Sequence, residues 1–245
     1  MKVVCIMQAR VGSSRLPGKV LKEICGRTVL EHDINRLKLV SNIDEIVIAT
    51  TVEEQDDEIV KESNRLGVKC FRGSENDVLS RYYFAAKENN ADVIVRVTSD
   101  CPCLDYNILN DMIKLFLQRS NDIDYINNTM DRTYPRGYDS EIFTFNILEN
   151  AFNNAKRDYE REHVTPYMYD LNNKFRLMSY KNSSDYSRYR VTLDTPEDLK
   201  VITAIYESLF KKNEYFLLED VIEFLDKNPQ IANINEKIEQ KKLGE

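Results

Sequence analysis

The chain has 245 residues, of which 42% are hydrophobic and 31% are charged, and its formal net charge is −7. This length suffices for one large α/β domain with a buried core, and glycine and proline are too sparse for long linkers. The negative charge would repel a nucleic-acid backbone, and no wide basic patch is evident in the sequence to overcome that repulsion. Composition therefore favours a compact enzyme that acts on small molecules, without a nucleic-acid partner.

The apolar run in the opening MKVVCIMQAR is too short for a signal-peptide core, and no stretch approaches membrane-spanning length. The five cysteines are odd in number, and three lie in or beside expected strands, which argues against a disulfide framework. Cys101 and Cys103 form a single close pair, and His32 and His163 stand far apart, which argues against a zinc site. We expect a cytoplasmic protein with no membrane segment.

In the first half of the chain, short β-rich runs alternate with helical patterns. We expect strands at residues 3–7, 45–51, 68–71 and 92–98, and helices at residues 28–40, 54–66 and 77–87. The continuous Val and Ile runs indicate strands that are covered on both faces. The pattern predicts an α/β fold built around a mostly parallel sheet.

The second half is less regular. It predicts a helix at residues 106–119, strands at 124–128, 175–180 and 189–193, a loop over 133–143, and helical stretches at 147–156 and 160–171. A further helix should begin after Thr195, with Thr195 as its N-cap, Pro196 in its first turn, and Glu197 and Asp198 offsetting its dipole. The tail IEQKKLGE, residues 238–245, is expected to be a frayed helix end.

The most informative segment is QARVGSSRLPGK, residues 8–19, directly after the first expected strand, where an open α/β sheet has its ligand crevice. It offers three kinds of phosphate-binding group, namely backbone freed by Gly12 and Gly18, hydroxyls of Ser13 and Ser14, and the cations Arg10, Arg15 and Lys19. It matches neither GxGxxG nor GxxxxGK[ST]. We interpret it as a binding loop for a compact polyphosphate, with a solvated basic loop as the alternative.

This loop resembles the signature xxARxxSxRLPGK of the CMP-sugar synthetases that activate 3-deoxy-octulosonic and nonulosonic acids. The likeness continues in order through GSENDVLSRYYFAAK, VRVTSDCPCL, PRGYDSEIF, YEREHVTPYMY and VTLDTPEDL, and so covers nearly the whole chain. It is strongest to the branch of the spore-coat polysaccharide biosynthesis protein F.

The resemblance implies the Rossmann-like nucleotide-diphospho-sugar transferase fold, a mostly parallel mixed sheet flanked by helices with a smaller acceptor-binding and dimerisation insertion. Residues 1–245 would form one nucleotidyltransferase domain. Within it, residues 1–105 would be the CTP-binding half, residues 106–190 the acceptor-binding and dimerisation part, and residues 191–245 the returning metal-site strand with the C-terminal helices. A homodimer is expected.

Two acids are candidate Mg²⁺ ligands. Asp100 follows the strand expected at residues 92–98, and Asp194 ends the strand expected at 189–193, so both should lie at the edge of the sheet that carries the phosphate loop. Each also has a plainer interpretation, Asp100 as a turn residue and Asp194 as part of a helix-start signal. The resemblance favours the metal role for both.

The resemblance also assigns the nucleotide and acceptor contacts. The nucleotide set is Gln8, Ala9, Arg10, Gly12, Ser13, Arg15, Lys19, Gly73, Ser74, Ser80, Arg81 and Ser99, and we expect Tyr82, Tyr83 and Phe84 in the core or facing a partner. In the acceptor set, Arg136, Arg161 and His163 would bind a carboxylate, and Asp139 and Glu141 sugar hydroxyls. Arg161 has an alternative in a surface ion pair with Glu160 or Glu162. Relatives often carry GLDVE where this chain has GYDSE, so its acceptor differs in our interpretation.

Together these features predict a cytidylyltransferase that transfers CMP from CTP to an acidic sugar or similar small hydroxy acid and releases pyrophosphate. Arg10, Arg15, Lys19 and Asp100 would be catalytic, and His163 or Asp194 is a candidate base. Two other functions remain open, a glycosyltransferase that consumes a nucleotide sugar and a nucleotide-binding regulatory protein. The first would not need the three cations of the loop, and the second would not need both acids.

Overall fold

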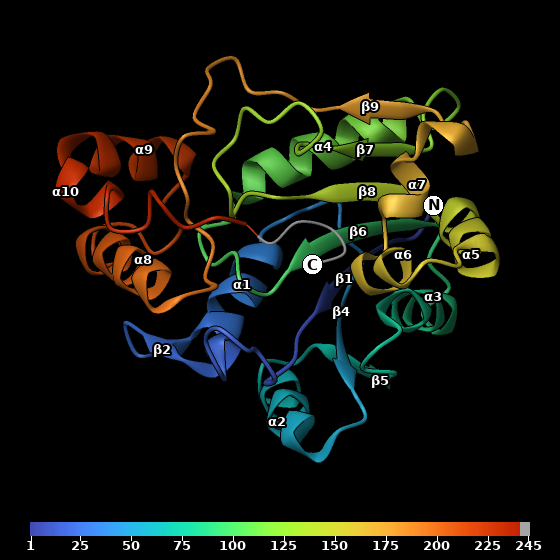
Figure 1. Ribbon diagram of the computed structural model, residues 1–245, viewed down its shortest axis with the longest axis horizontal. Coiled ribbons are helices and arrows are strands. Elements are labelled where there is room, and N and C mark those ends of the chain that lie inside the picture. Colours follow the sequence, from blue (N-terminus) through green and yellow to red (C-terminus); the bar gives the residue numbers. More distant parts are fainter. Residues whose placement is uncertain (241–245) are drawn as a thin grey trace.

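The computed structural model describes residues 1–240, which fold around a seven-stranded mixed sheet with the strand order β5-β4-β1-β6-β8-β7-β9 (Figure 1). The strands are β1 (Val3–Gln8), β4 (Glu45–Thr51), β5 (Lys69–Gly73), β6 (Val93–Thr98), β7 (Tyr125–Asn127), β8 (Glu141–Thr144) and β9 (Leu177–Ser179). Of these, β8 runs antiparallel to its neighbours β6 and β7, and the other pairings are parallel. The α/β fold with a mostly parallel mixed sheet is confirmed.

Helices cover both faces of the sheet because its central strands are apolar on both sides. Cys5 and Met7 of β1 pack with α1 (Val29–Leu37), α2 (Asp57–Arg65) and α4 (Tyr106–Gln118). Val4 and Ile6 face the opposite way, onto α3 (Val78–Glu88), α5 (Phe145–Asn154) and α7 (Pro166–Tyr169). A third apolar cluster joins α8 (Pro196–Leu209), α9 (Leu218–Lys227) and the segment that follows α10 (Pro229–Ala232).

Smaller elements complete the fold. A separate hairpin pairs β2 (Glu23–Ile24) with β3 (Arg27–Thr28), and 3-10 turns occupy η1 (Lys19–Leu21), η2 (Glu54–Asp56) and η3 (Leu171–Asn173). The helix expected over residues 160–171 is two helices, α6 (Asp158–His163) and α7. Val164 between them has a φ of 73°, and Pro166 begins α7 because proline fits the first turn of a helix.

One loop prediction and one strand prediction were wrong. Residues 133–143 are not all loop, because their end forms β8, which lies between β6 and β7. Residues 189–193 are not a strand of the sheet, because β8 already occupies the position beside β6. That segment instead makes an isolated bridge between Arg136 and Arg190 and a hydrogen bond from the Leu193 N–H to the Asp100 carbonyl oxygen, at 2.8 Å. Asp194 therefore does not end a sheet strand.

The helix predicted after Thr195 is confirmed as α8, and the Thr195 hydroxyl accepts a hydrogen bond from the Asp198 N–H at 3.2 Å. Tyr82 and Tyr83 are buried in the core, as expected, whereas Phe84 is 46% exposed. The expected frayed helix over residues 238–245 is not present at residues 238–240, and residues 241–245 lie outside the described part of the chain.

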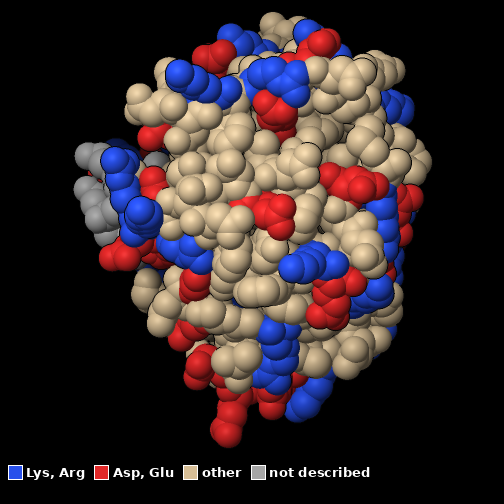
Figure 2. All heavy atoms as spheres, turned by 90° about the vertical axis from the view of Figure 1, so that its right-hand side faces the viewer, with Lys and Arg blue, Asp and Glu red and all other residues tan. Residues whose placement is uncertain are grey.

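Figure 2 shows the face formed by the right-hand side of Figure 1. Among the residues coloured there, Lys and Arg are scattered among Asp and Glu and form no continuous basic patch. Over residues 1–240, the structure contains no helix that is both long and apolar enough to cross a membrane.

Candidate active site

A cleft of about 800 Å³ opens at the carboxyl ends of β1 and β6, and the first turns of α3 and residues of α6 form its far wall. The strand order explains the position of the cleft. Strands β1 and β6 are adjacent in the sheet, so the loops that follow them lie side by side at the carboxyl ends of the strands. The lining residues are Gln8, Ala9, Arg10, Ser13, Ser14, Arg15, Lys19, Val20, Glu75, Asn76, Asp77, Val78, Arg81, Thr98, Ser99, Asp100, Asp158, Arg161, Glu162, His163 and Asp194.

The loop after β1 is held in a compact turn by its own backbone and by the Asp56 side chain. The Val11 N–H donates to Asp56 Oδ1 at 2.7 Å, and the Gly18 N–H donates to the Val11 carbonyl oxygen at 3.0 Å. Gly18 has a φ of 65°, a left-handed conformation that glycine adopts without strain, and it places Lys19 at the start of η1. The turn thereby directs Lys19 into the cleft.

Asp100 and Asp194 meet at this lysine. Lys19 Nζ lies 2.7 Å from Asp100 Oδ2 and 2.7 Å from Asp194 Oδ1, and Arg15 Nη2 lies 3.2 Å from Asp194 Oδ2. The two acids are far apart in sequence and come from different loops. At one end of the cleft, these two carboxylates are therefore in direct contact with the two cations Arg15 and Lys19.

The charges of this cluster are mutually stabilised. Burial by itself would raise the pKa of Asp100, but the Lys19 ammonium and hydrogen bonds from Thr98 and Cys101 lower that pKa to about 2. Burial would likewise lower the pKa of Lys19, but Asp100 and Asp194 outweigh it and raise that pKa. Asp100 is therefore an anion and Lys19 a cation throughout the neutral range.

The chemistry of these donors suits Mg²⁺. This ion prefers oxygen ligands, and in phosphate-transferring sites it takes one or two carboxylates and completes its shell with phosphate oxygens and water. Asp100 and Asp194 supply such a pair of carboxylates, held close enough to share one ammonium group. Within residues 1–240, no group of three or more His, Cys, Asp or Glu side chains could hold a metal, so phosphate oxygens would have to complete the shell.

Arg81 is a buried cation beside the cleft. It is 2% exposed, and its Nε and Nη1 atoms have no hydrogen-bond partner within the described chain. Burial and the nearby Arg10 lower its pKa. Gly73 makes room for it, because a Cβ atom there would lie 3.3 Å from Arg81 Cγ and 3.1 Å from a ring carbon of Phe71. A buried guanidinium without an anion is costly, so the arrangement fits an anionic or carbonyl-rich ligand in the cleft.

The other expected nucleotide contacts divide into two groups. Gln8, Ala9, Arg10, Ser13 and Ser99 line the cleft, and the Ser99 hydroxyl donates to the Gln8 carbonyl oxygen at 2.8 Å. Gly12, Gly73, Ser74 and Ser80 do not line it. Ser74 Oγ accepts the Asp77 N–H at 3.1 Å, and the Ser80 hydroxyl donates to the Asp77 carbonyl oxygen at 2.8 Å. These two serines shape the start of α3.

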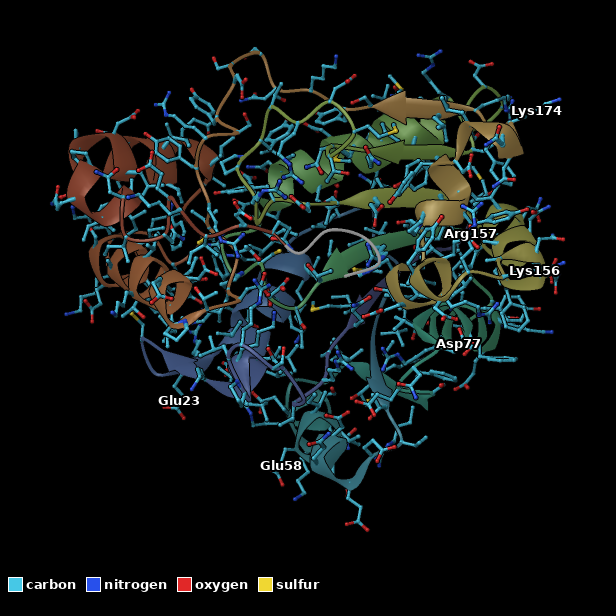
Figure 3. All side chains as sticks on the ribbon, in the orientation of Figure 1. Glu23, Glu58, Asp77, Lys156, Arg157 and Lys174 are labelled. Carbon is cyan, nitrogen blue, oxygen red and sulfur yellow. The ribbon has the colours of Figure 1, made fainter. Side chains whose placement is uncertain are left out.

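The expected acceptor residues are less concentrated. Arg161 lines the cleft but makes a two-pronged ion pair with Asp77, at 2.5 Å and 3.0 Å, in place of the alternative pair with Glu160 or Glu162. Asp77, labelled in Figure 3, also caps α3, so this pair joins α3 to α6. His163 lines the cleft too, and burial lowers its pKa, which leaves the imidazole neutral at pH 7.

Asp139, Glu141 and Arg136 lie outside the lining of the cleft. Asp139 accepts two hydrogen bonds from Arg132, at 2.6 Å and 2.8 Å. Glu141 is buried in β8, where it pairs with Arg96 and accepts a hydrogen bond from Thr165 at 2.8 Å. The Arg136 guanidinium is half-buried, and burial and the neighbouring Arg132 lower its pKa.

Sequence reasoning missed Asp77, which lines the cleft and holds Arg161. It also missed Arg96, which lies outside the lining and pairs with Glu141. Arg96 could have been found as a charge inside the apolar run DVIVRVT. The signal for Asp77 was weaker, a helix-capping residue before VLSRYYF.

A family model described as cytidylyltransferase matches residues 4–238. The chain is 32% identical over 241 residues to the spore coat polysaccharide biosynthesis protein SpsF of Bacillus subtilis, covering 96% of this chain and 98% of that protein.

Solved structures show the same likeness. A cytidylyltransferase from Leptospira borgpetersenii is 39% identical and superposes with a TM-score of 0.91, covering 99% of this chain and all of that one. A CMP:2-keto-3-deoxy-manno-octonic acid synthetase in complex with CTP is 16% identical and has a TM-score of 0.66, covering 84% of this chain and 99% of that one, which shows a shared fold.

Proposed function

Because this chain belongs to the cytidylyltransferase family, we propose that it transfers CMP from CTP to a hydroxyl of an acidic sugar of the ulosonic or nonulosonic type, or of a similar hydroxy acid, and releases pyrophosphate. The product would feed the synthesis of a surface polysaccharide or glycoconjugate. One observation carries this proposal, the convergence of Arg15, Lys19, Asp100 and Asp194 at one end of the cleft.

In the proposed reaction, the acceptor hydroxyl loses its proton and its oxygen attacks the α-phosphorus of CTP. The bond from the α-phosphorus to the bridging oxygen breaks, and that oxygen leaves with pyrophosphate. Arg10, Arg15 and Lys19 would stabilise the negative charge that grows on the leaving phosphates. Lys19 lies against both carboxylates, so its ammonium is held at the end of the cleft where the phosphates would bind.

Asp100 and Asp194 would hold Mg²⁺, which when bound offsets phosphate charge and lowers the pKa of a coordinated hydroxyl. His163 is the candidate base on the acceptor side, because it lines the cleft and its lowered pKa keeps it able to accept a proton at pH 7. Asp194 is the alternative base. The cleft volume of about 800 Å³ is of the size that small-molecule sites take.

The test is a pyrophosphate-release screen with four nucleoside triphosphates against a panel of acidic sugars. We expect release with CTP and one class of carboxylated acceptor, together with a CMP-linked product. A glycosyltransferase would release a nucleotide and no pyrophosphate, and a regulatory protein would bind nucleotide without turnover. Pyrophosphate release that required no acceptor, or that favoured ATP, would contradict the proposal.

We expect Arg81 to bind the nucleotide at a cost in stability. In Arg81→Met, the KM for CTP should rise about tenfold or more, because a charged hydrogen bond to the ligand is lost. The melting temperature should stay the same or rise, because the substitution removes a buried cation whose Nε and Nη1 have no hydrogen-bond partner in the described part of the chain. Arg72→Met, which removes a partly exposed ion pair with Asp57, is the matched control. A fall in stability with an unchanged KM for CTP would assign Arg81 to the fold alone.

We expect His163 to act on the acceptor side of the cleft, which it lines. His163→Gln should raise the KM for the acceptor more than the KM for CTP and should also lower turnover, because the contact to the acceptor and the candidate base are lost together. Arg161→Met should differ, raising both values, because Arg161 also holds α6 against α3 through Asp77. Arg119→Met, on the exposed end of α4, is the control. Equal rises in both KM values with unchanged turnover in His163→Gln would contradict a role for His163 on the acceptor side.

The oligomer and the compartment belong to the same proposal. We propose a homodimer formed through the second half of the chain, which sedimentation of the purified protein would test. We place the reaction in the cytoplasm, since all five cysteines are free thiols and a reducing compartment would keep them so.

A further inference from the structure

Asp194 lies in a segment that is not part of the sheet. Asp100 follows β6, whose ladder with β1 and β8 fixes it. Residues 189–195 have only the isolated bridge at Arg190 and scattered backbone hydrogen bonds. Something other than a strand ladder must hold Asp194 beside Lys19.

A buried ion pair does this locally. Arg190 donates from Nε and Nη2 to the two oxygens of Asp198, at 2.8 Å and 2.9 Å, and from Nη2 to Asp194 Oδ2 at 3.3 Å. Asp198 in turn accepts the backbone N–H groups of Asp194 and Thr195, each at 3.0 Å. Asp198 is 0% exposed, so its role exceeds the dipole compensation expected from the sequence. Arg190 thus holds the side chain of Asp194, and Asp198 holds its backbone N–H group.

The chain after α10 adds further hydrogen bonds to Arg190 and Asp198. In Figure 1 it runs from α10 back toward the arrowhead of β6. The Asn235 side-chain amide donates to Asp198 Oδ1 at 2.8 Å and to the Arg190 carbonyl oxygen at 3.0 Å, and Asn235 is 2% exposed. Gln240 Oε1 accepts from Arg190 Nη1 at 2.9 Å. Ile234 packs on the cluster of α8 and α9, which anchors the segment.

We infer that Arg190, Asp198 and Asn235 are positioning residues, and that the segment after α10 holds the Asp194 carboxylate in the geometry that binds the metal–nucleotide complex. This inference rests on the proposed function, in which Asp194 is a metal ligand. Outer groups that orient a metal-binding carboxylate commonly affect metal affinity by about 10- to 100-fold when they are removed. None of the three residues needs to touch a substrate.

Asn235 gives the sharpest test, because substitutions there can separate its hydrogen bonds from its shape. Asn235→Ala removes both donors and most of the side chain, whereas Asn235→Leu removes the donors but keeps a side chain of similar size. Asn235→Asp removes the amide donor and places a carboxylate against Asp198 and the Arg190 carbonyl oxygen. If Asn235 only fills space, Asn235→Leu should bind Mn²⁺ as the parent does. If it positions Asp194 through hydrogen bonds, Asn235→Leu should weaken Mn²⁺ binding as Asn235→Ala does, and Asn235→Asp should weaken it most.

The readout is the Kd for Mn²⁺ in the presence of CTP, measured by electron paramagnetic resonance on folded protein. We expect Asn235→Ala to raise this Kd about tenfold and Asn235→Asp to raise it further. Asn233→Ala is the matched control, because Asn233 lies on the same segment and is exposed. If no Asn235 variant yields folded protein, Gln240→Ala should still raise the Kd, to a smaller extent, through the same guanidinium.

Asp194→Asn, measured alongside, separates this inference from the proposed function. Loss of Mn²⁺ binding in Asp194→Asn with unchanged binding in the Asn235 variants would overturn the positioning role alone. An equal effect in Asn233→Ala would overturn it as well. Unchanged Mn²⁺ binding in Asp194→Asn would instead overturn the metal assignment on which it rests.

Discussion

Asp100→Asn and Asp194→Asn should each lower turnover by about a thousandfold, because charge stabilisation by a bound metal is worth several kcal/mol and each 1.4 kcal/mol is a factor of ten. Both substitutions preserve shape and remove a charge. The two carboxylates lie within 2.7 Å of one ammonium, so they would serve one metal ion. Steady-state pyrophosphate release at saturating CTP and acceptor measures the effect.

The double variant should be scarcely worse than either single variant, because residues that act as a unit are not additive. Asp131→Asn, which removes an exposed carboxylate paired with Lys181, should leave turnover unchanged. Circular dichroism should show that all the variants fold. Full metal-dependent turnover in either single variant, or losses that multiply in the double variant, would refute a shared metal site.

Lys19→Ala and Arg15→Ala should lower turnover by about two to three orders of magnitude, because these cations act on the charge that develops during pyrophosphate release. The fold should persist in both variants. Lys22→Ala is the control for Lys19, since Lys22 does not line the cleft. Near-normal pyrophosphate release from either folded variant would contradict the proposal that the loop binds the triphosphate.

Lys19→Ala should also change how stability depends on pH. The pKa of Asp100 in the folded protein is about 2, below its ordinary value near 3.9, so Asp100 contributes stability that is present above pH 4 and is lost as the pH falls toward 2. Without Lys19 the pKa of Asp100 should rise, and that contribution should shrink. The free energies of unfolding of the parent and Lys19→Ala proteins, measured in urea, should therefore differ most near neutral pH and become similar toward pH 2.

Much of the fold followed from local patterns. The apolar run at residues 3–7 predicted β1, because a strand buried on both faces is apolar at successive positions. Thr195 with Pro196 predicted the start of α8, because these residue types are preferred at helix N-termini. The antiparallel β8 was missed because it is short and follows Pro135, Gly137 and Asp139, residue types that are common in turns.

The family, the α/β class and the loop of residues 8–19 could be predicted from the sequence alone, since these depend on neighbouring residues and on the order of motifs. The partners of the charged side chains could not, and they became known from the three-dimensional structure. Arg161 pairs with Asp77 and not with an adjacent glutamate, Asp198 holds Arg190, and two nitrogens of Arg81 have no hydrogen-bond partner among residues 1–240. Periodicity in the sequence indicates which side chains are buried, whereas ion pairs between distant segments form only when packing brings those segments together.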